Sequence, residues 1–289
     1  MPHIRCAEDE LAKTEPYQLL DAGEEKKLEM IGPYMVTRQA AQAYWPKSRT
    51  RDWKNMDAIH HRSSSGGGRW EFRNRLPESW TISHGPFKFV VKLTGFGHIG
   101  LFPEQLENWH WIQQNSSDPK MKVINLFGYT GGSTLAAAAG SAQVTHVDAS
   151  KGVVTWAREN AELNGLQDKP VRWIVEDVGR FIEREVKRGN HYQGLILDPP
   201  SFGRGPRGQV WKIETDLIPL LETLKKIMNP LKFILLSCHT PGYSPRCLTN
   251  ILNLVFDIPV AEAQQGEMLA SIKDSDLVLP SGTYARWSS

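Results

Sequence analysis

Residues 123–133 read VINLFGYTGGS, and this stretch decides the fold class of the chain. An apolar run ends in a glycine-rich turn, which opens onto a segment of high helix propensity, Thr134–Ala139. Strand, glycine turn and helix in this order form the first unit of a nucleotide-binding α/β domain. Gly128, Gly131 and Gly132 would let the backbone adopt positive φ angles and approach a ligand closely. The alternative is an ordinary glycine-rich loop between a strand and a helix.

Beyond residue 121 the chain alternates strand and helix patterns, as expected for a parallel sheet with helices on both faces. Four further strands are expected at 144–147, 171–175, 194–197 and 233–236, with helices between them. Two final strands are expected at Leu254–Phe256 and Tyr284–Trp287. The predicted fold is α/β, with a Rossmann-like, seven-stranded, mostly parallel sheet.

The first 115 residues have a different texture. Short strand-like pieces at 71–72, 80–82 and 88–93 alternate with turn signals such as Pro77 and Gly85-Pro86. We therefore expect a small β-rich N-terminal domain at 1–115 that recognises the substrate. The polar stretch Asn115–Pro119 would separate it from the α/β domain at 116–289.

Composition excludes several classes of protein. A net charge of +2 over 289 residues gives no global field for nucleic acid, so any basic surface must be local. The three cysteines have neither metal-site spacing nor an even number, which favours a reducing compartment and no metal. The first ten residues are too polar for a signal peptide, and no apolar run reaches the ~18 residues that span a membrane. These features predict a cytoplasmic protein without a membrane partner.

Polar residues follow the predicted strands at the points where the strands end. They are Asn125, Asp148, Asp177, Asp198 and Cys238. Because ligands bind outside the carboxyl ends of the strands in an open parallel sheet, we expect these side chains to converge on one crevice bordered by the 128–132 turn.

Two of these acids have the spacing of cofactor ligands. Asp148 stands twenty residues after Gly128, where a carboxylate can accept both hydroxyls of an adenosine ribose, and Asp177 would approach the adenine edge. For both, the alternative is a helix N-cap. A pyrophosphate-binding G-x-G-x-x-G turn would need glycine at Thr130 and Ser133, so a cofactor without a pyrophosphate is favoured.

The most specific motif is Asp198-Pro199-Pro200-Ser201-Phe202. The prolines fix φ and form a rigid corner, which would hold the carboxylate and the backbone carbonyls in set directions beside a reacting group. Phe202 offers a flat face on which a base can stack.

Together these motifs carry a family resemblance. The segments 125–131 (NLFGYTG), 147–150 (VDAS), 198–202 (DPPSF) and 237–238 (SC), with Asn160 and 164–166 (NGL), resemble the class I S-adenosylmethionine-dependent methyltransferases. Within them the chain is most similar to the bacterial large-subunit ribosomal RNA methyltransferases that include 5-methylcytosine enzymes. The segment 95–105 (GFGHIGLFPEQ) resembles the stretch before the catalytic domain of that family. Leu106 and Trp109 stand where the family usually has arginines, and no PUA module is evident.

The resemblance implies roles for individual residues. Cys238 would add to cytosine C6, with Asp198, Pro199 and Pro200 completing the catalytic set, and RNA, most of all ribosomal RNA, would contact Phe202, Arg69 and Arg73. Cys238 could instead be a buried structural cysteine. S-adenosylmethionine would be held by Asn125, Phe127, Gly128, Tyr129, Thr130, Gly131, Asp148, Ala149, Ser150, Asp177, Val178, Asp198, Phe102 and Gln105.

Two other functions stay open. One is methylation of a ring nitrogen or an exocyclic amine, with Cys238 idle. The other is a protein that holds the cofactor and assists RNA assembly without catalysing transfer. A homodimer also stays open beside a monomer.

Overall fold

The computed structural model describes residues 14–63, 66–205 and 208–289. They form two compact units. Unit 1 consists of the described residues up to Leu106 together with Leu269–Ser281, and unit 2 consists of Glu107–Met268 together with Gly282–Ser289. This division differs from the predicted segments at two places. Helix α2 (Leu106–Asn115) belongs to unit 2 from Glu107 onward, where Trp111 packs on Phe233 of the sheet. Residues 269–281 belong to unit 1, where Ile272 forms a bridge to Leu19.

Unit 1 is rich in strands, as expected. A five-stranded sheet has the order β1-β2-β3-β4-β5, and β6 and β7 form a separate hairpin. Arg38 of β3 and Glu29 of the neighbouring β2 form a buried ion pair, in which the guanidinium donates to both carboxylate oxygens at 2.6 Å. The elements of unit 1 are β1 (Tyr17–Gly23), β2 (Lys26–Ile31), β3 (Tyr34–Gln39), η1 (Asp52–Lys54), β4 (Ala58–Arg62), β5 (Gly68–Phe72), β6 (Trp80–His84), β7 (Phe87–Val91) and η2 (Pro103–Gln105).

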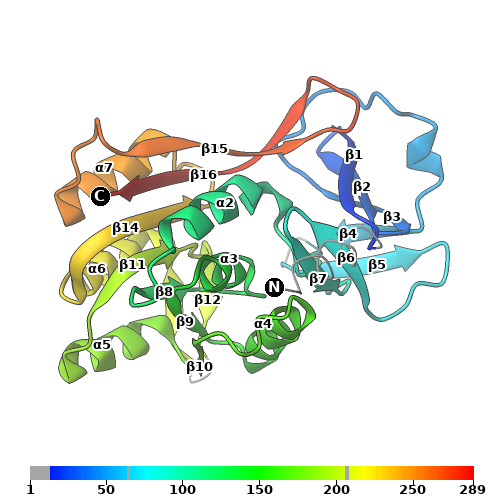
Figure 1. Cartoon of the computed structure of the whole chain (residues 1–289). Coiled ribbons are helices and arrows are strands. Elements are labelled where there is room, and N and C mark those ends of the chain that lie inside the picture. Colours follow the sequence, from blue (N-terminus) through cyan, green and yellow to red (C-terminus); the bar gives the residue numbers. More distant parts are fainter. Residues whose placement is uncertain (1–13, 64–65, 206–207) are drawn as a thin grey trace. The chain divides into compact units, whose positions relative to one another are not determined.

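Unit 2 is built on the predicted seven-stranded sheet, with the order β10-β9-β8-β11-β14-β16-β15 (Figure 1). The strands β10, β9, β8, β11 and β14 run parallel to their neighbours, and β16 pairs antiparallel with β14. The Rossmann-like fold prediction is therefore confirmed. The strands are β8 (Lys122–Leu126), β9 (Gln143–Asp148), β10 (Val171–Val175), β11 (Tyr192–Leu197), β14 (Met228–Cys238), β15 (Gln264–Ser271) and β16 (Val278–Ser288), with a small hairpin of β12 (Phe202–Arg204) and β13 (Val210–Lys212).

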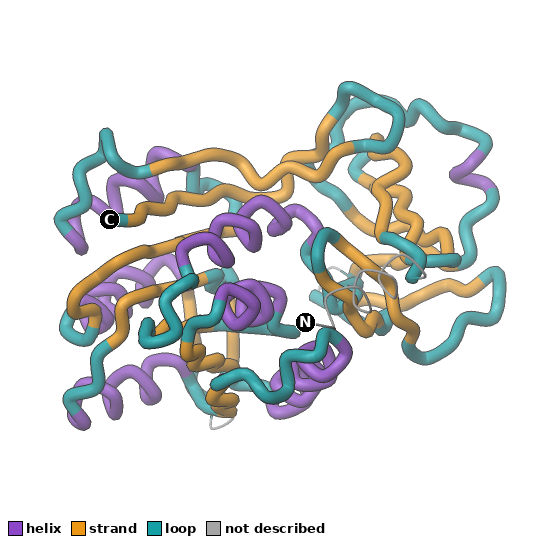
Figure 2. The backbone as a smooth tube through the Cα atoms, viewed as in Figure 1, coloured by secondary structure: helices purple, strands orange, loops and turns teal. Residues whose placement is uncertain are grey.

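Helices cover both faces of this sheet (Figure 2). On one face, Phe181, Leu221 and Leu252 pack against alternate strand residues such as Leu197 and Leu236. On the other face Trp111 packs on Phe233, and α3 contacts β8 and β9. The first face is covered by α5 (Val178–Arg188), α6 (Ile213–Lys225) and α7 (Pro245–Phe256), and the helices α3 (Gly132–Gly140) and α4 (Lys151–Leu163) precede them in the chain.

One predicted strand is wrong. Leu254–Phe256 is the last turn of α7, and the seventh strand is β15 instead. Ser244 caps this helix by accepting a hydrogen bond from the Cys247 amide at 3.2 Å, and Pro245 follows at the first helical position. Buried side chains at 248, 252 and 255 recur with a helical period. The strand propensity of Leu254–Phe256 is therefore outweighed by the helix cap at Ser244 and by the helical spacing of the buried residues.

Candidate functional site

The glycine turn after β8 has an unusual backbone. Phe127 and Tyr129 adopt left-handed φ angles of 54° and 48°, and Gly131 has a φ of 92°. Bulky residues rarely adopt this conformation, and such strain concentrates at ligand sites. The turn is fixed from α4, where the Asn160 amide donates to the Thr130 carbonyl at 2.9 Å. A strained loop, held by a hydrogen bond from α4, thus follows β8.

Gly128 and Gly132 are closely packed by side chains of the protein. Among the three glycines of the turn, only Gly131 has a positive φ, so the expected positive φ is not found at the other two. A Cβ on Gly128 would lie 2.5 Å from the His146 ring, and a Cβ on Gly132 would lie 2.6 Å from Trp109. Both positions therefore require glycine for packing inside the protein.

His146 is part of a buried network beneath the turn. The Asn125 amide donates to the Thr134 hydroxyl at 2.8 Å, and that hydroxyl lies 2.9 Å from Nδ1 of His146. The other ring nitrogen, Nε2, is buried and has no hydrogen-bond partner among the described residues. Burial lowers the pKa of His146 to about 3, so the ring is neutral. The sequence analysis missed this histidine, whose only signal was its position in the strand before Asp148.

Asp148 lies at the carboxyl end of β9, beside the turn. Its carboxylate accepts hydrogen bonds from the amides of Tyr129 at 3.1 Å and Ser150 at 2.9 Å. Ser150, not Asp148, caps α4, through the Val153 amide. The capping alternative for Asp148 is therefore wrong. Burial raises the pKa of Asp148 against the opposing effect of these two amides, as expected for a carboxylate that lacks bulk hydration.

Asp177 follows β10 and does cap a helix. Its Oδ1 accepts a hydrogen bond from the Arg180 amide at 3.0 Å, at the start of α5, where Val178 is the first residue. Asp177 is therefore the helix N-cap that the alternative predicted. Its second oxygen, Oδ2, takes no part in the cap and lies near Gly205, where an added Cβ would be 3.3 Å from it.

The Asp198–Phe202 motif follows β11 and leads into the β12–β13 hairpin. The Trp211 indole donates to the Pro200 carbonyl at 2.7 Å, and the hydroxyls of Ser201 and Thr240 lie 2.7 Å apart. Phe202 is 51% exposed, which leaves its ring accessible to a partner. The corner is thus braced against the segment that follows β14.

Cys238 is the last residue of β14, the strand next to β11. Strand register aligns Leu197 of β11 with Leu236 of β14, so Asp198 and Cys238 lie at the same edge of the sheet. His239 bridges the two strand ends, with Nδ1 3.4 Å from Oδ1 of Asp198. The thiol is only 1% exposed and accepts from the Thr240 amide at 3.4 Å. Burial raises the pKa of Cys238, and the charge of Asp198 raises it further, so the resting group is a thiol.

The remaining predicted residues fall into two sets. Ala149 lies between Asp148 and Ser150 at the β9 end in unit 2. The others belong to unit 1. Phe102 makes an edge-to-face contact with His98, and Gln105 is 4% exposed. Arg69 near the start of β5 and Arg73 just after its end are both exposed, and Arg73 donates to the Lys54 carbonyl. Cys6 lies outside the described residues.

Two further features concern metal binding and the membrane. No group of three or more His, Cys, Asp or Glu residues there could hold a metal ion. No helix there has the length and apolar character needed to cross a membrane.

Comparison with known proteins agrees with this geometry. A model of the family described as S-adenosylmethionine-dependent methyltransferase matches residues 34–252. The crystal structure of a SAM-dependent methyltransferase from Agrobacterium tumefaciens is 36% identical, with a TM-score of 0.86 over 95% of this chain and 91% of that one. A methyltransferase structure complexed with SAH shares the fold at 18% identity, with a TM-score of 0.72 over 98% of this chain and 79% of that one.

Curated relatives match the chain over a shorter region. The ribosomal RNA large subunit methyltransferases K/L of Shewanella baltica and Pseudoalteromonas atlantica are 34% and 37% identical over 145 residues, which is 50% of this chain. The chain spans about a fifth of the length of these relatives, since the match covers 20% of each. Because the family model includes the strained turn, Asp148 and the Asp198 corner, the chain belongs to the S-adenosylmethionine-dependent methyltransferases, with S-adenosylmethionine as its cofactor.

Proposed function

We propose that this chain methylates RNA, with ribosomal RNA as the substrate and cytosine C5 as the target atom. Two relatives that are 34% and 37% identical to this chain over an aligned segment of 145 residues are named as ribosomal RNA large subunit methyltransferases. Such a substrate would place the reaction in the cytoplasm. The exposed Arg69 and Arg73 of unit 1 would contact RNA phosphates, and Phe202 of unit 2 would stack on a base.

The cofactor would lie along the turn after β8. The buried carboxylate of Asp148 fits a ribose, because hydroxyl donors would replace the hydration that burial removes. The remaining turn residues, with Asp177 and Val178, would border the adenine and the sulfonium end. The bound cofactor supplies an electrophilic methyl group.

The observation that carries the proposal is the set of groups at the ends of β11 and β14. Asp198, His239 and Cys238 share one sheet edge, and the 3.4 Å contact joins the first two. Cytosine C5 is a poor nucleophile. Addition of the Cys238 sulfur to C6 places the electron pair on C5, which then forms its bond to the methyl group as S-adenosylhomocysteine leaves. A base then removes the C5 proton, and the C6–S bond breaks to release the thiolate and restore the ring.

The pair formed by Asp198 and His239 would supply the acid–base groups of this sequence. Asp198 would lie at the N3/N4 edge of the base, and His239 would accept a proton, either from the Cys238 thiol or from C5. His239 therefore fills a role to which the sequence alone assigned no residue.

Burial of the thiol supports a second candidate. A cysteine that is 1% exposed, with a raised pKa, is poorly prepared to attack a base. In this candidate the Asp198–Ser201 corner orients a ring nitrogen or exocyclic amine, and Cys238 only packs in the core.

Substitution of Cys238 by alanine separates the two chemistries. The substrate would be total RNA from cells that lack this protein, incubated with labelled cofactor and followed by nucleoside analysis. We expect Cys238→Ala to reduce transfer to cytosine at least about a thousandfold, because covalent activation is lost. Cys247→Ala is the matched control, since this cysteine is partly exposed on α7 and should leave transfer unchanged.

A covalent test adds a readout that does not depend on turnover. RNA carrying 5-fluorocytosine should stay covalently bound to Cys238, because C5 then carries fluorine in place of the proton that the base must remove before the C6–S bond can break. Full activity of Cys238→Ala, without any adduct in the parent protein, would move the proposal to nitrogen methylation. Unlabelled RNA with an intact cofactor complex would instead indicate an assembly factor.

A further inference from the structure

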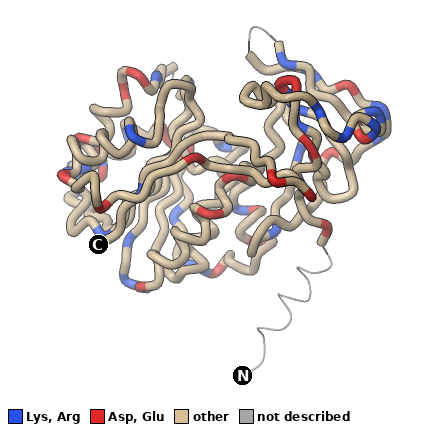
Figure 3. The backbone as a smooth tube through the Cα atoms, turned by 90° about the horizontal axis from the view of Figure 1, so that it is seen from above, with Lys and Arg blue, Asp and Glu red and all other residues tan. Residues whose placement is uncertain are grey.

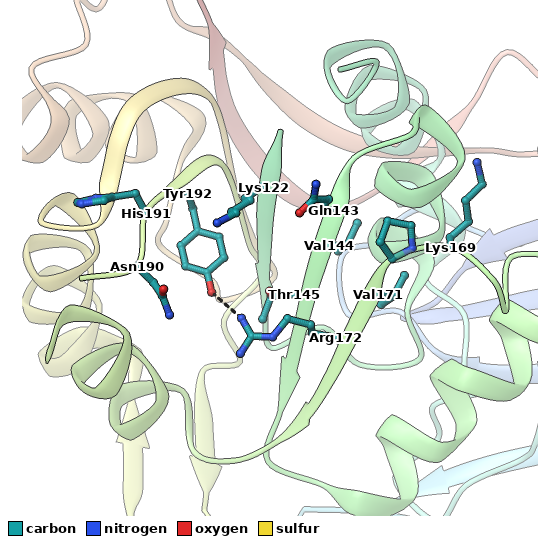
Figure 4. A pocket seen from close by; sticks show the side chains of 11 residues that line it. Lys122, Gln143, Val144, Thr145, Lys169, Val171, Arg172, Asn190, His191 and Tyr192 are labelled. Carbon is teal, nitrogen blue, oxygen red and sulfur yellow. Dashed lines mark hydrogen bonds between the residues drawn. The ribbon is translucent and has the colours of Figure 1, made fainter. Parts of the chain in front are cut away.

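A cavity of about 420 Å³ lies at the edge of the unit 2 sheet opposite to Asp148 and Asp198. It is formed where β8, β9, β10 and β11 begin, by their first residues and the loops just before them (Figure 4). Its size is within the range of small-ligand pockets in proteins. Neither the proposed methyl transfer nor the cofactor uses this edge.

The charged side chains that line the cavity are all basic or potentially basic. They are Lys122, Lys169, Arg172 and His191, and none of the eleven lining residues has a carboxylate. In Figure 3 most Lys and Arg of the described backbone are interspersed with Asp and Glu, and one further group of Lys and Arg stands out in unit 1. The cavity is therefore a local concentration of positive charge in a chain of net charge +2.

The carboxylate beside Arg172 already has hydrogen-bond donors. Glu185 is buried, and its carboxylate accepts hydrogen bonds from Tyr192 at 2.6 Å, Asn190 at 2.8 Å and Arg188 at 3.2 Å. Arg172 lies farther from it, at 3.8 Å, with its Nη1 3.4 Å from the Tyr192 hydroxyl (Figure 4). Glu185 thus holds the side chains of Tyr192 and Asn190, which line the cavity. The guanidinium of Arg172 keeps most of its N–H donors for another acceptor.

Main-chain donors at this edge are used within the protein. The amides of Lys122, Val171 and Tyr192 donate to Gln193, Lys169 and Ile227. A ligand would therefore be recognised through the long cationic side chains. The planar guanidinium of Arg172, together with the ammonium group of Lys122, matches the several oxygens and the charge of a phosphate, whereas the Lys169 side chain points away from Arg172 (Figure 4).

We propose that this cavity binds the phosphate group of a ligand through Lys122 and Arg172. The phosphate would come either from the backbone of an RNA or from a free phosphate ester. Binding of an RNA phosphate rests on the proposed function as an RNA methyltransferase. Binding of a phosphate group as such does not.

The test is a titration of the isotopically labelled full chain, followed by NMR and calorimetry. S-adenosylhomocysteine is present throughout to fill the cofactor site. The probes are inorganic pyrophosphate, ribose 5-phosphate and a short single-stranded RNA, with ribose as the uncharged comparison. We expect shifts at 122, 143–145, 169–172 and 190–192 with the phosphate probes and none with ribose. Lys122→Gln/Arg172→Gln should weaken binding about tenfold or more.

A matched pair of substitutions controls for net charge. Lys187→Gln/Lys226→Gln removes two exposed lysines of the same unit that do not line the cavity, and it should change affinity less than twofold. Equal weakening by both pairs, shifts spread over the surface, or no binding of any probe would overturn the proposal. Binding of RNA but not of ribose 5-phosphate assigns the site to the RNA backbone, and the reverse assigns it to a free ester. Methylation assays on the parent protein keep the two proposals apart, because a parent protein that methylates RNA but binds none of the phosphate probes would overturn only this one.

Discussion

Gly128 is the residue whose substitution best tests the strained turn. Gly128→Ala would place a methyl group 2.5 Å from a wholly buried His146, which the Thr134 hydroxyl holds in place. We expect a loss of about 1–3 kcal/mol in the free energy of unfolding, as for overpacking elsewhere, and at least a tenfold weaker cofactor complex. Thermal unfolding and calorimetric titration with S-adenosylhomocysteine measure the two effects.

Gly152→Ala is the control for this substitution. Gly152 lies in the first turn of α4, and a Cβ there would meet no atom within 4 Å. Alanine should stabilise that helix by up to ~1 kcal/mol. Equal behaviour of the two variants would mean that His146 does not restrict the turn.

At this scale the sequence predicted the positions of the polar residues but not their partners. Asp148, Asp198 and Cys238 could be placed because each follows a recognisable strand, and parallel strands end at one edge. The packing of His146 under Gly128, and of Trp109 under Gly132, joins residues eighteen or more positions apart and leaves no local pattern. The same is true of the contact between His239 and Asp198.

Among the elements, α5 offers a test that separates helix capping from cofactor binding. Asp177→Asn keeps a side-chain oxygen for the Arg180 amide, whereas Asp177→Ala removes it. We expect the alanine variant alone to lose about 1 kcal/mol of stability, because asparagine and aspartate cap equally well. If Asp177 also contacts the cofactor through its carboxylate, both variants should weaken the S-adenosylhomocysteine complex. Unchanged cofactor affinity in both would leave Asp177 with a capping role only.

Helix α7 shows where element prediction failed and why. The run at 254–256 has residues of high strand propensity, yet it continues a helix begun by Ser244 and Pro245. Strand propensity mostly reflects packing on a pleated surface, so it is overridden when an apolar helical stripe already fits the core. The five parallel strands were predicted correctly because they are short apolar runs with turn signals on both sides.

For the molecule as a whole, the least predictable feature was the exchange of segments between the units. Residues 269–281 join unit 1, where Arg49 donates to the Lys273 carbonyl, although they are far from the rest of that unit in sequence. The early strands β1–β3 were also not located individually, because their buried positions include charged residues such as Glu29 and Arg38. Buried ion pairs disguise the alternation that identifies a half-buried strand.

The buried titratable groups predict how stability changes on the acid side. The pKa of His146 in unit 2 is about 3 in the folded protein, against 6.5 for an ordinary histidine. The unfolded chain therefore binds more protons between these values. Stability contributed by the neutral ring is present above pH 6.5 and lost as the pH falls towards 3. Glu29 of unit 1 acts in a lower window: burial raises its pKa, but Arg38 and Lys27 outweigh this and lower it to about 2, against 4.5, so its contribution is lost below about pH 4.5.

Hydrogen exchange, corrected for the intrinsic rate at each pH, can follow the two units separately. Protection of β8 and β9 should decrease between pH 6.5 and 4.5, with His146 as the cause. His146→Asn should remove this slope, because asparagine does not titrate. His110→Gln, a change of an exposed histidine on α2, should leave it intact. A slope that persists in His146→Asn would assign the proton uptake to another group, and the neutral Asn125–Thr134–His146 network beneath the turn would no longer account for the acid sensitivity of the cofactor-binding unit.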